Sequence, residues 1–171
     1  MRYAALLRGI NVGGNTNIAM ADLAGLLKGL GYENVSTYLR SGNAVFDARK
    51  RPKPEDIESA IERELGVDVK VMIRTHDELV AAVEANPFPE AVENPKTLHV
   101  SFLSAAPKSP HVDADAIAPD EVAFVGTQMY IWTPNGIGRS KVSQHASDKK
   151  LGVAATARNW NTVLKLVEMT S

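Results

Sequence analysis

Glycine, asparagine and basic residues gather in a few short loops of this sequence, and these residue types bind anions. The first such loop reads Leu7-Arg8-Gly9-Ile10-Asn11-Val12-Gly13-Gly14. Glycines allow backbone amides to turn toward an anion, Arg8 offers a two-pronged guanidinium, and Asn11 can donate from its amide. The spacing matches neither the Walker phosphate loop nor the dinucleotide fingerprint. It therefore predicts an anion site of another kind, with a simple tight turn at Gly13-Gly14 as the alternative.

Three further loops have a similar composition. The segment Arg40-Ser41-Gly42-Asn43 carries the residues of a hairpin turn. The segment Asn135-Gly136-Ile137-Gly138-Arg139-Ser140-Lys141 combines two glycines, two cations and a hydroxyl. The segment Thr156-Ala157-Arg158-Asn159 precedes a predicted helix, whose free amides and dipole attract anions. Ordinary turns, a helix cap at Thr156 and solvated surface are the alternatives for these loops.

Together the four loops supply one set of candidate ligand-binding residues. The set is Arg8, Asn11, Gly13, Gly14, Ser41, Asn43, Arg139, Ser140, Lys141, Arg158 and Asn159. We expect the cations and the glycine amides to hold an anion and the Asn and Ser side chains to orient the ligand. No activated nucleophile or acid pair is visible, so any chemistry would rest on electrostatic stabilisation. The four histidines lack metal-ligand spacing, so no metal is expected, and no cofactor is indicated.

Hydrophobic periodicity predicts the elements of the first half. These are a strand over 3–10, a helix with leucines at 23, 26, 27 and 30, a hairpin over 35–39 and 44–46, a helix over 54–65, and an alternating strand over 67–73 with one buried face. The order βαββαβ is that of ferredoxin-like folds. In that topology the first two strands are parallel, so the loops that follow them should leave at the same edge of the sheet.

The second half is also mixed α and β. Thr75 and Glu78 predict a capping box for a helix through Val83. Further predictions are a strand over 97–103, a connection over 107–120, a hairpin over 122–125 and 129–132, and a final helix from Trp160 to Val167. The predicted fold class is therefore α+β with two packed lobes, a ferredoxin-like lobe over 1–74 and a second lobe of similar topology over 75–171.

Composition narrows the class of protein. The chain has 171 residues, of which 44% are hydrophobic and 23% charged, as in globular proteins. The formal net charge of -1 excludes a global field toward nucleic acid or membrane, and any such partner needs a local patch. Lys and Arg exceed Asp and Glu by seven to three in residues 1–51 and by six to two in residues 122–171. Because there is no cysteine and no long apolar stretch, we expect a cytoplasmic protein that is not held by a membrane.

Three segments in this order resemble the bacterial family of domain of unknown function 1697. They are the loop Leu7–Gly14, the stretch Thr37-Tyr38-Leu39-Arg40-Ser41-Gly42-Asn43-Ala44-Val45-Phe46, and the segment 156–162. The resemblance spans nearly the whole chain and also covers Arg139-Ser140-Lys141. It implies two lobes of ferredoxin-like topology and brings no established activity. Asn15-Thr16-Asn17 departs from it, since relatives commonly carry a lysine near the glycines.

Three functions of different classes remain open from the residues. The leading hypothesis is binding of, or chemistry on, a phosphate-bearing small molecule or nucleotide in a cleft between the lobes. The alternative is a nucleic-acid-binding protein that uses the local basic patches, which predicts a steep dependence of affinity on salt. The third is a structural or self-associating protein without a ligand, in which loop mutations change stability or oligomeric mass.

Overall fold

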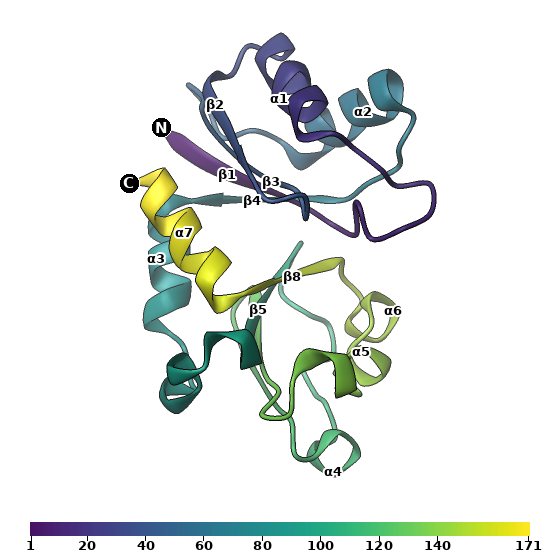
Figure 1. The fold of residues 1–171 in the computed structure, drawn as a ribbon, viewed down its shortest axis with the longest axis vertical. Coiled ribbons are helices and arrows are strands. Elements are labelled where there is room, and N and C mark those ends of the chain that lie inside the picture. The colour runs from purple at the N-terminus through teal and green to yellow at the C-terminus, as the bar shows by residue number, and fades with distance from the viewer. The chain divides into compact units, whose positions relative to one another are not determined.

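A computed structural model describes residues 1–171 and divides them into two compact units. The first unit comprises Met1–Leu79 and Leu166–Ser171, and the second comprises Val80–Lys165. Each unit contains one four-stranded antiparallel sheet, and the chain forms seven α-helices (Figure 1). The predicted α+β class is confirmed.

The first unit has the βαββαβ order predicted from the sequence. Its elements are β1 (Arg2–Leu7), α1 (Met20–Gly29), β2 (Glu33–Tyr38), β3 (Asn43–Asp47), α2 (Pro54–Leu65) and β4 (Val71–Thr75). The sheet order is β2-β3-β1-β4, and all neighbouring strands are antiparallel. In this arrangement β3 lies between the parallel strands β1 and β2, which is the ferredoxin-like topology.

Helices α1 and α2 cover one face of this sheet (Figure 1). Helix α1 buries Leu23, Leu26 and Leu27, which the predicted leucine spacing places on one side of the helix. Helix α2 begins with Pro54 and ends at Gly66, whose φ of 68° is the left-handed conformation that stops a helix. The leucines and the apolar face of α2 form one core with alternate residues of the strands.

Strand β4 differs from its prediction in extent and in burial. The expected strand over 67–73 had one buried face, whereas β4 spans Val71–Thr75 and both Met72 and Arg74 are buried. Val67 and Val69 still join the core, but from the segment before the strand. Alternation of apolar residues therefore extended beyond the residues that pair with β1, because a connecting segment can bury valines without forming a ladder.

The second unit repeats the strand order of the first. Its sheet has the order β6-β7-β5-β8 and is antiparallel throughout. The strands are β5 (Leu98–Leu103), β6 (Glu121–Val125), β7 (Gln128–Trp132) and β8 (Ala155–Asn159). Between them lie the short helices α4 (Ala114–Ile117), α5 (Val142–His145) and α6 (Asp148–Leu151), and short 3₁₀ turns occur at Pro89–Glu93, Pro95–Thr97 and Ile137–Arg139.

Two longer helices contribute residues to both units. They are α3 (His76–Glu84) and α7 (Trp160–Thr170). The predicted capping box opens α3: the amide of Thr75 donates to Glu78 Oε2 at 2.8 Å, and the amide of Glu78 donates to Thr75 Oγ1 at 3.2 Å. At the other end of α3, the Tyr130 hydroxyl donates to the carbonyl of Ala82 at 2.6 Å, and burial raises the pKa of this tyrosine to about 12.

Strand β8 and the short helices were not predicted from the sequence, and the predicted cap of α7 was wrong. Thr156 lies inside β8 and is buried. The cap is Asn159, whose Oδ1 accepts from the amide of Thr162 at 2.9 Å. Both residue types favour N-caps, so the sequence alone could not choose between them. Pairing of β8 with β5 leaves the residue at the end of the strand to cap the helix.

Candidate functional site

The loops after β1 and β2 lie at one edge of the first sheet, as the strand order predicts. We call this region the glycine edge and define it as residues 8–17 with the turn 39–42. The amide of Leu7 donates to the carbonyl of Gly42 at 2.9 Å, which brings the two loops together. Six of the predicted binding residues are therefore near one another in the first unit: Arg8, Asn11, Gly13, Gly14, Ser41 and Asn43.

Asn11 fastens the two loops of the glycine edge to each other. Its Nδ2 donates to the carbonyls of Ile18 at 2.8 Å and Arg40 at 2.7 Å, and its Oδ1 accepts from the amide of Ile18 at 2.8 Å. The residue has a φ of 57°, which asparagine tolerates better than most residues. Both amide hydrogens are therefore committed to the fold, and Asn11 acts by shaping the loop.

Asn43 closes the turn in a similar way. It is fully buried, and its Nδ2 donates to the carbonyl of Tyr38 at 2.7 Å and to Ser41 Oγ at 3.1 Å. Gly42 has a φ of 93°, and a Cβ there would lie 2.8 Å from Ile10 Cδ1. The turn is thus fixed by one buried amide and by one position where only glycine fits.

Gly13 and Gly14 form the exposed tip of the edge. Their φ angles are 100° and 80°, and nothing lies within 4 Å of a Cβ built on either residue. The backbone amides of residues 12–15 donate to no acceptor in the chain. Arg8, also exposed, follows directly on β1 at the same edge. The tip therefore presents unused amide donors and open space, in the same loop that begins with Arg8.

The other five predicted residues belong to the second unit. Arg139 and Lys141 are exposed, and Ser140 Oγ accepts from the amide of Val142 at the start of α5. Arg158 is only 6% exposed, and its Nη1 donates to Thr156 Oγ1 at 2.7 Å and to the carbonyl of Ala157 at 2.9 Å. Burial lowers the pKa of Arg158 to about 10. Asn159 caps α7, so Ser140 and Asn159 each have a structural role.

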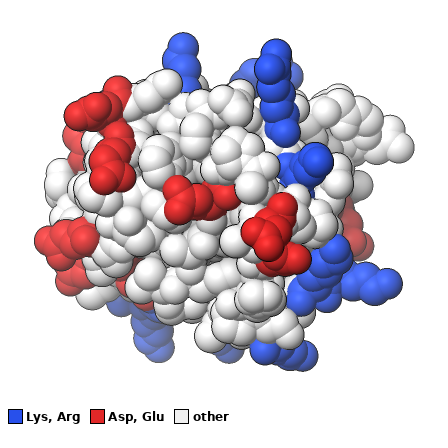
Figure 2. Space-filling model, turned by 90° about the horizontal axis from the view of Figure 1, so that it is seen from below, with Lys and Arg blue, Asp and Glu red and all other residues white.

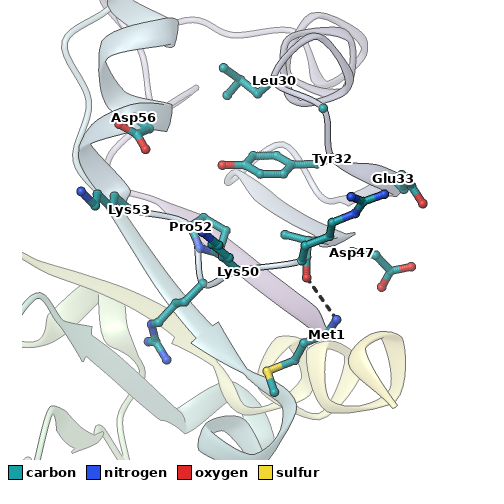
Figure 3. A pocket seen from close by; sticks show the side chains of 13 residues that line it. Met1, Leu30, Tyr32, Glu33, Asp47, Lys50, Pro52, Lys53 and Asp56 are labelled. Atoms are coloured by element: carbon teal, nitrogen blue, oxygen red, sulfur yellow. Dashed lines mark hydrogen bonds between the residues drawn. The ribbon is translucent and has the colours of Figure 1, made fainter.

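A pocket at the opposite end of the first sheet was missed from the sequence. We call it the Tyr32 pocket (Figure 3), and its volume is about 790 Å³. Its lining comes from the start of β1, the start of β2 and the segment from the end of β3 into α2. The available signal was the run Arg49-Lys50-Arg51-Pro52-Lys53, which places four cations in five residues just before a helix.

Charge on the surface is mixed. Figure 2 shows one face on which Asp and Glu side chains occur at the left and centre, and Lys and Arg side chains occur mainly at the top, the right and the lower margin. No broad basic area covers this face. A nucleic-acid-binding surface needs several Lys or Arg side chains placed to contact successive phosphates of the nucleic acid. The face in Figure 2 therefore adds nothing in favour of that alternative.

The fold and the loops define a protein of two ferredoxin-like units with a glycine-rich edge. A family model described as protein of unknown function (DUF1697) matches residues 1–130, and the chain belongs to this family. The predicted family is thereby confirmed, and the match contains the segments at 7–14 and 37–46, whereas those at 139–141 and 156–162 lie outside it. Among solved structures, the chain resembles the conserved bacterial protein SP0830 from Streptococcus pneumoniae at 22% identity and a TM-score of 0.67, over 99% of this chain and 98% of that chain.

At this identity the likeness to the Streptococcus pneumoniae protein concerns the fold. A comparison with curated proteins finds no match. No helix of the structure combines the length and the apolar character that crossing a membrane requires.

Proposed function

We propose that this protein binds a phosphate-bearing small molecule or nucleotide at the glycine edge. The observation that supports the proposal is the group of unused amides at residues 12–15, around two positive-φ glycines and in the loop that begins with Arg8. Backbone amides and a guanidinium are the donors that phosphate oxygens accept from most strongly. Glycine also allows a ligand to approach the backbone closely.

Asn11 and Asn43 support the site by holding its two loops in place. Their side-chain amides are used on backbone carbonyls and on Ser41, so the donors offered to a ligand come from the backbone and Arg8. Fixed donors of this kind bind without reorganisation and stabilise negative charge. They provide no nucleophile and no general base, so the proposed function is binding. The exposed cations Arg139 and Lys141 are proposed as a further anion contact within the second unit.

The test is the thermal shift caused by pyrophosphate and by nucleotides in the wild type, in Arg8→Ala and in Gly13→Ala. A ligand that binds only the folded state raises stability by RT ln(1 + [L]/Kd). Loss of one charge-assisted contact should weaken binding by about tenfold or more. Gly13→Ala keeps the charge but places a methyl group at the tip, so it should weaken binding as well. Arg63→Ala, an exposed change in the last turn of α2, is the matched control.

Three other results would contradict this proposal or favour one of the alternative functions. A shift that Arg8→Ala leaves intact contradicts binding at the glycine edge. Binding of short RNA that falls steeply with salt favours the nucleic-acid alternative. If no ligand shifts the wild type and the loop variants change oligomeric mass, the structural role replaces this proposal.

A further inference from the structure

We propose that the Tyr32 pocket is a second binding site, which takes a phosphate monoester of a hydroxylated, ring-bearing molecule. The site lies at the end of the first sheet opposite the glycine edge. In the register of β1 and β3, Arg2 pairs with Asp47 beside the pocket, whereas Leu6 pairs with Asn43 beside the glycine edge. The inference does not rest on the proposed function, because the two sites share no residue.

Some charged side chains of the pocket are paired within the chain and are here called committed, whereas others have no such partner. Arg51 is committed, since its guanidinium contacts both carboxylate oxygens of Glu78, at 2.8 and 3.1 Å, and the carbonyl of Ile73. Asp47 is also committed, to Arg2 at 3.2 Å and to Asn34 at 2.8 Å. These pairs hold the ends of the pocket segment in place and leave its other cations to face solvent.

Three exposed cations of the lining make no hydrogen bond or ion pair through their side chains: Arg49, Lys50 and Lys53. They occur within five residues of a segment that is anchored at Ala48, whose amide donates to the carbonyl of Met1, and at the start of α2. Lys53 is the N-cap of α2 and provides no side-chain cap, so the positive end of that helix dipole adds to the same field. The positive electrostatic potential of these cations and of the helix dipole favours a ligand that carries an anionic group.

The remainder of the lining suits a ring. The Tyr32 ring stacks on Phe46 with centroids 4.4 Å apart and planes 15° apart, which fixes its position. Figure 3 shows the ring crossing the pocket, with its hydroxyl directed toward the side from which Asp56 and Lys53 extend. Leu30 and Pro52 add apolar surface. A volume of about 790 Å³ is within the range of pockets for small organic ligands.

Two carboxylates of the lining other than Asp47 disfavour a ligand that carries several negative charges. Asp56 and Glu33 make no ion pair, and burial together with the charge of Asp56 raises the pKa of Tyr32. Carboxylates accept hydrogen bonds from hydroxyl groups and repel a second phosphate. The preferred ligand therefore combines one phosphate, next to the lysines, with hydroxyls for the acids. A nucleoside monophosphate and a sugar phosphate share this chemistry.

The experiment is a titration of the full-length protein with adenosine 5′-monophosphate, ribose 5-phosphate and inorganic phosphate, followed by backbone amide NMR shifts. We expect shifts at residues 30–33 and 47–56 with the two organic phosphates and at least tenfold weaker binding of inorganic phosphate. The double variant Lys50→Ala/Lys53→Ala should weaken organic phosphate binding about tenfold or more, whereas Arg63→Ala and Arg8→Ala should not change it at this site.

Each outcome decides a separate point. If adenosine 5′-monophosphate binds more tightly than ribose 5-phosphate, the pocket recognises an aromatic ring in addition to the phosphate. If the two bind equally, the pocket recognises the sugar phosphate. Shifts confined to residues 8–17 leave the glycine edge standing and overturn the pocket proposal. Binding of inorganic phosphate as tight as that of the organic phosphates also overturns it, as does full affinity in the lysine double variant.

Discussion

Gly42 determines how closely the two loops of the glycine edge approach each other. Its φ of 93° lies outside the range of ordinary side chains. Its missing side chain also makes room, because a Cβ would lie 2.8 Å from Ile10 Cδ1 and 2.9 Å from Leu7 Cβ. A distance below 3.0 Å to a buried side chain requires the core itself to shift. The residue therefore contributes both conformational freedom and space.

We expect Gly42→Ala to lower the free energy of unfolding by about 2–4 kcal/mol, through backbone strain together with overpacking. Urea denaturation of the purified variant measures this change. Gly13→Ala is the matched control, since its φ is also positive but nothing lies within 4 Å of the new Cβ, and it should cost only about 1–2 kcal/mol. Equal losses in the two variants would contradict the role of packing at Gly42.

The sequence predicted which residues lie at the candidate site, but it predicted only in part what each of them does there. The positive-φ glycines and the shared edge followed from loop composition and strand order. The roles of Asn11 and Asn43 did not, because an asparagine that donates to a ligand and one that donates to a neighbouring carbonyl look alike in a sequence. Only the distances to Ile18, Arg40 and Tyr38 distinguish them.

Among the elements, helix α3 shows how one side chain can serve two neighbours. Glu78 accepts from the amide of Thr75 at the start of the helix and from the guanidinium of Arg51 near the pocket segment. Burial raises the pKa of Glu78, but these hydrogen bonds and the nearby charges of Arg51 and Arg74 outweigh it, so the pKa is lowered overall. The carboxylate form is thus the one that the fold stabilises.

We expect Glu78→Gln to destabilise the protein by about 1–2 kcal/mol at neutral pH, since an amide oxygen caps and pairs less strongly than a carboxylate. A folded-state pKa below the unfolded value contributes stability above the unfolded pKa, and this stability is lost as the pH falls through the folded pKa. The difference between wild type and variant should therefore shrink below the unfolded pKa of about 4.5.

Urea midpoints measured from neutral to acidic pH test this expectation. Glu62→Gln, an exposed change on α2 with no side-chain partner, should alter stability little at any pH. A constant difference between wild type and Glu78→Gln across the whole pH range would show that the charge of Glu78 is not what stabilises the helix start.

Elements with strong local signals were predicted well. The leucines of α1, the proline and glycine at the ends of α2, and the capping box of α3 each act within a few residues. Strand β8 was missed because the residues that it buries, Thr156 and Arg158, are polar, so Ala155–Asn159 lacks the apolar alternation typical of a strand. Its identity as a strand comes from pairing with β5, more than fifty residues earlier, and no local pattern encodes that pairing.

For the whole molecule, the first unit depends on residues from both ends of the chain. Leu166 is fully buried, and the carbonyl of Met169 accepts from Arg2 Nε at 2.8 Å. The hydroxyl of Thr170 lies 3.0 Å from Nδ1 of His76. The last turns of α7 therefore belong to the first unit, although 86 residues of the second unit precede them.

We expect removal of Leu166–Ser171 to lower the stability of the first unit by about 3 kcal/mol or more, because a buried leucine and these hydrogen bonds are lost. Amide hydrogen exchange of β1 and β4 measures the effect within that unit. Removal of Ser171 alone, which is exposed, is the control and should leave exchange unchanged. Unaltered protection of β1 in the longer truncation would show that the first unit is stable without its C-terminal residues.

The pairing of β1 with β4 also affects how the chain folds while it is being made. Strand β1 lies in the middle of its sheet, yet Tyr3 pairs with Thr75. At roughly 5–20 residues per second, a ribosome adds the intervening residues over several seconds. The apolar residues of β1 therefore leave the exit tunnel of the ribosome before β4, one of the two strands that pair with β1, has been made. Chaperones that shield short apolar segments therefore have a defined interval in which to act on this protein.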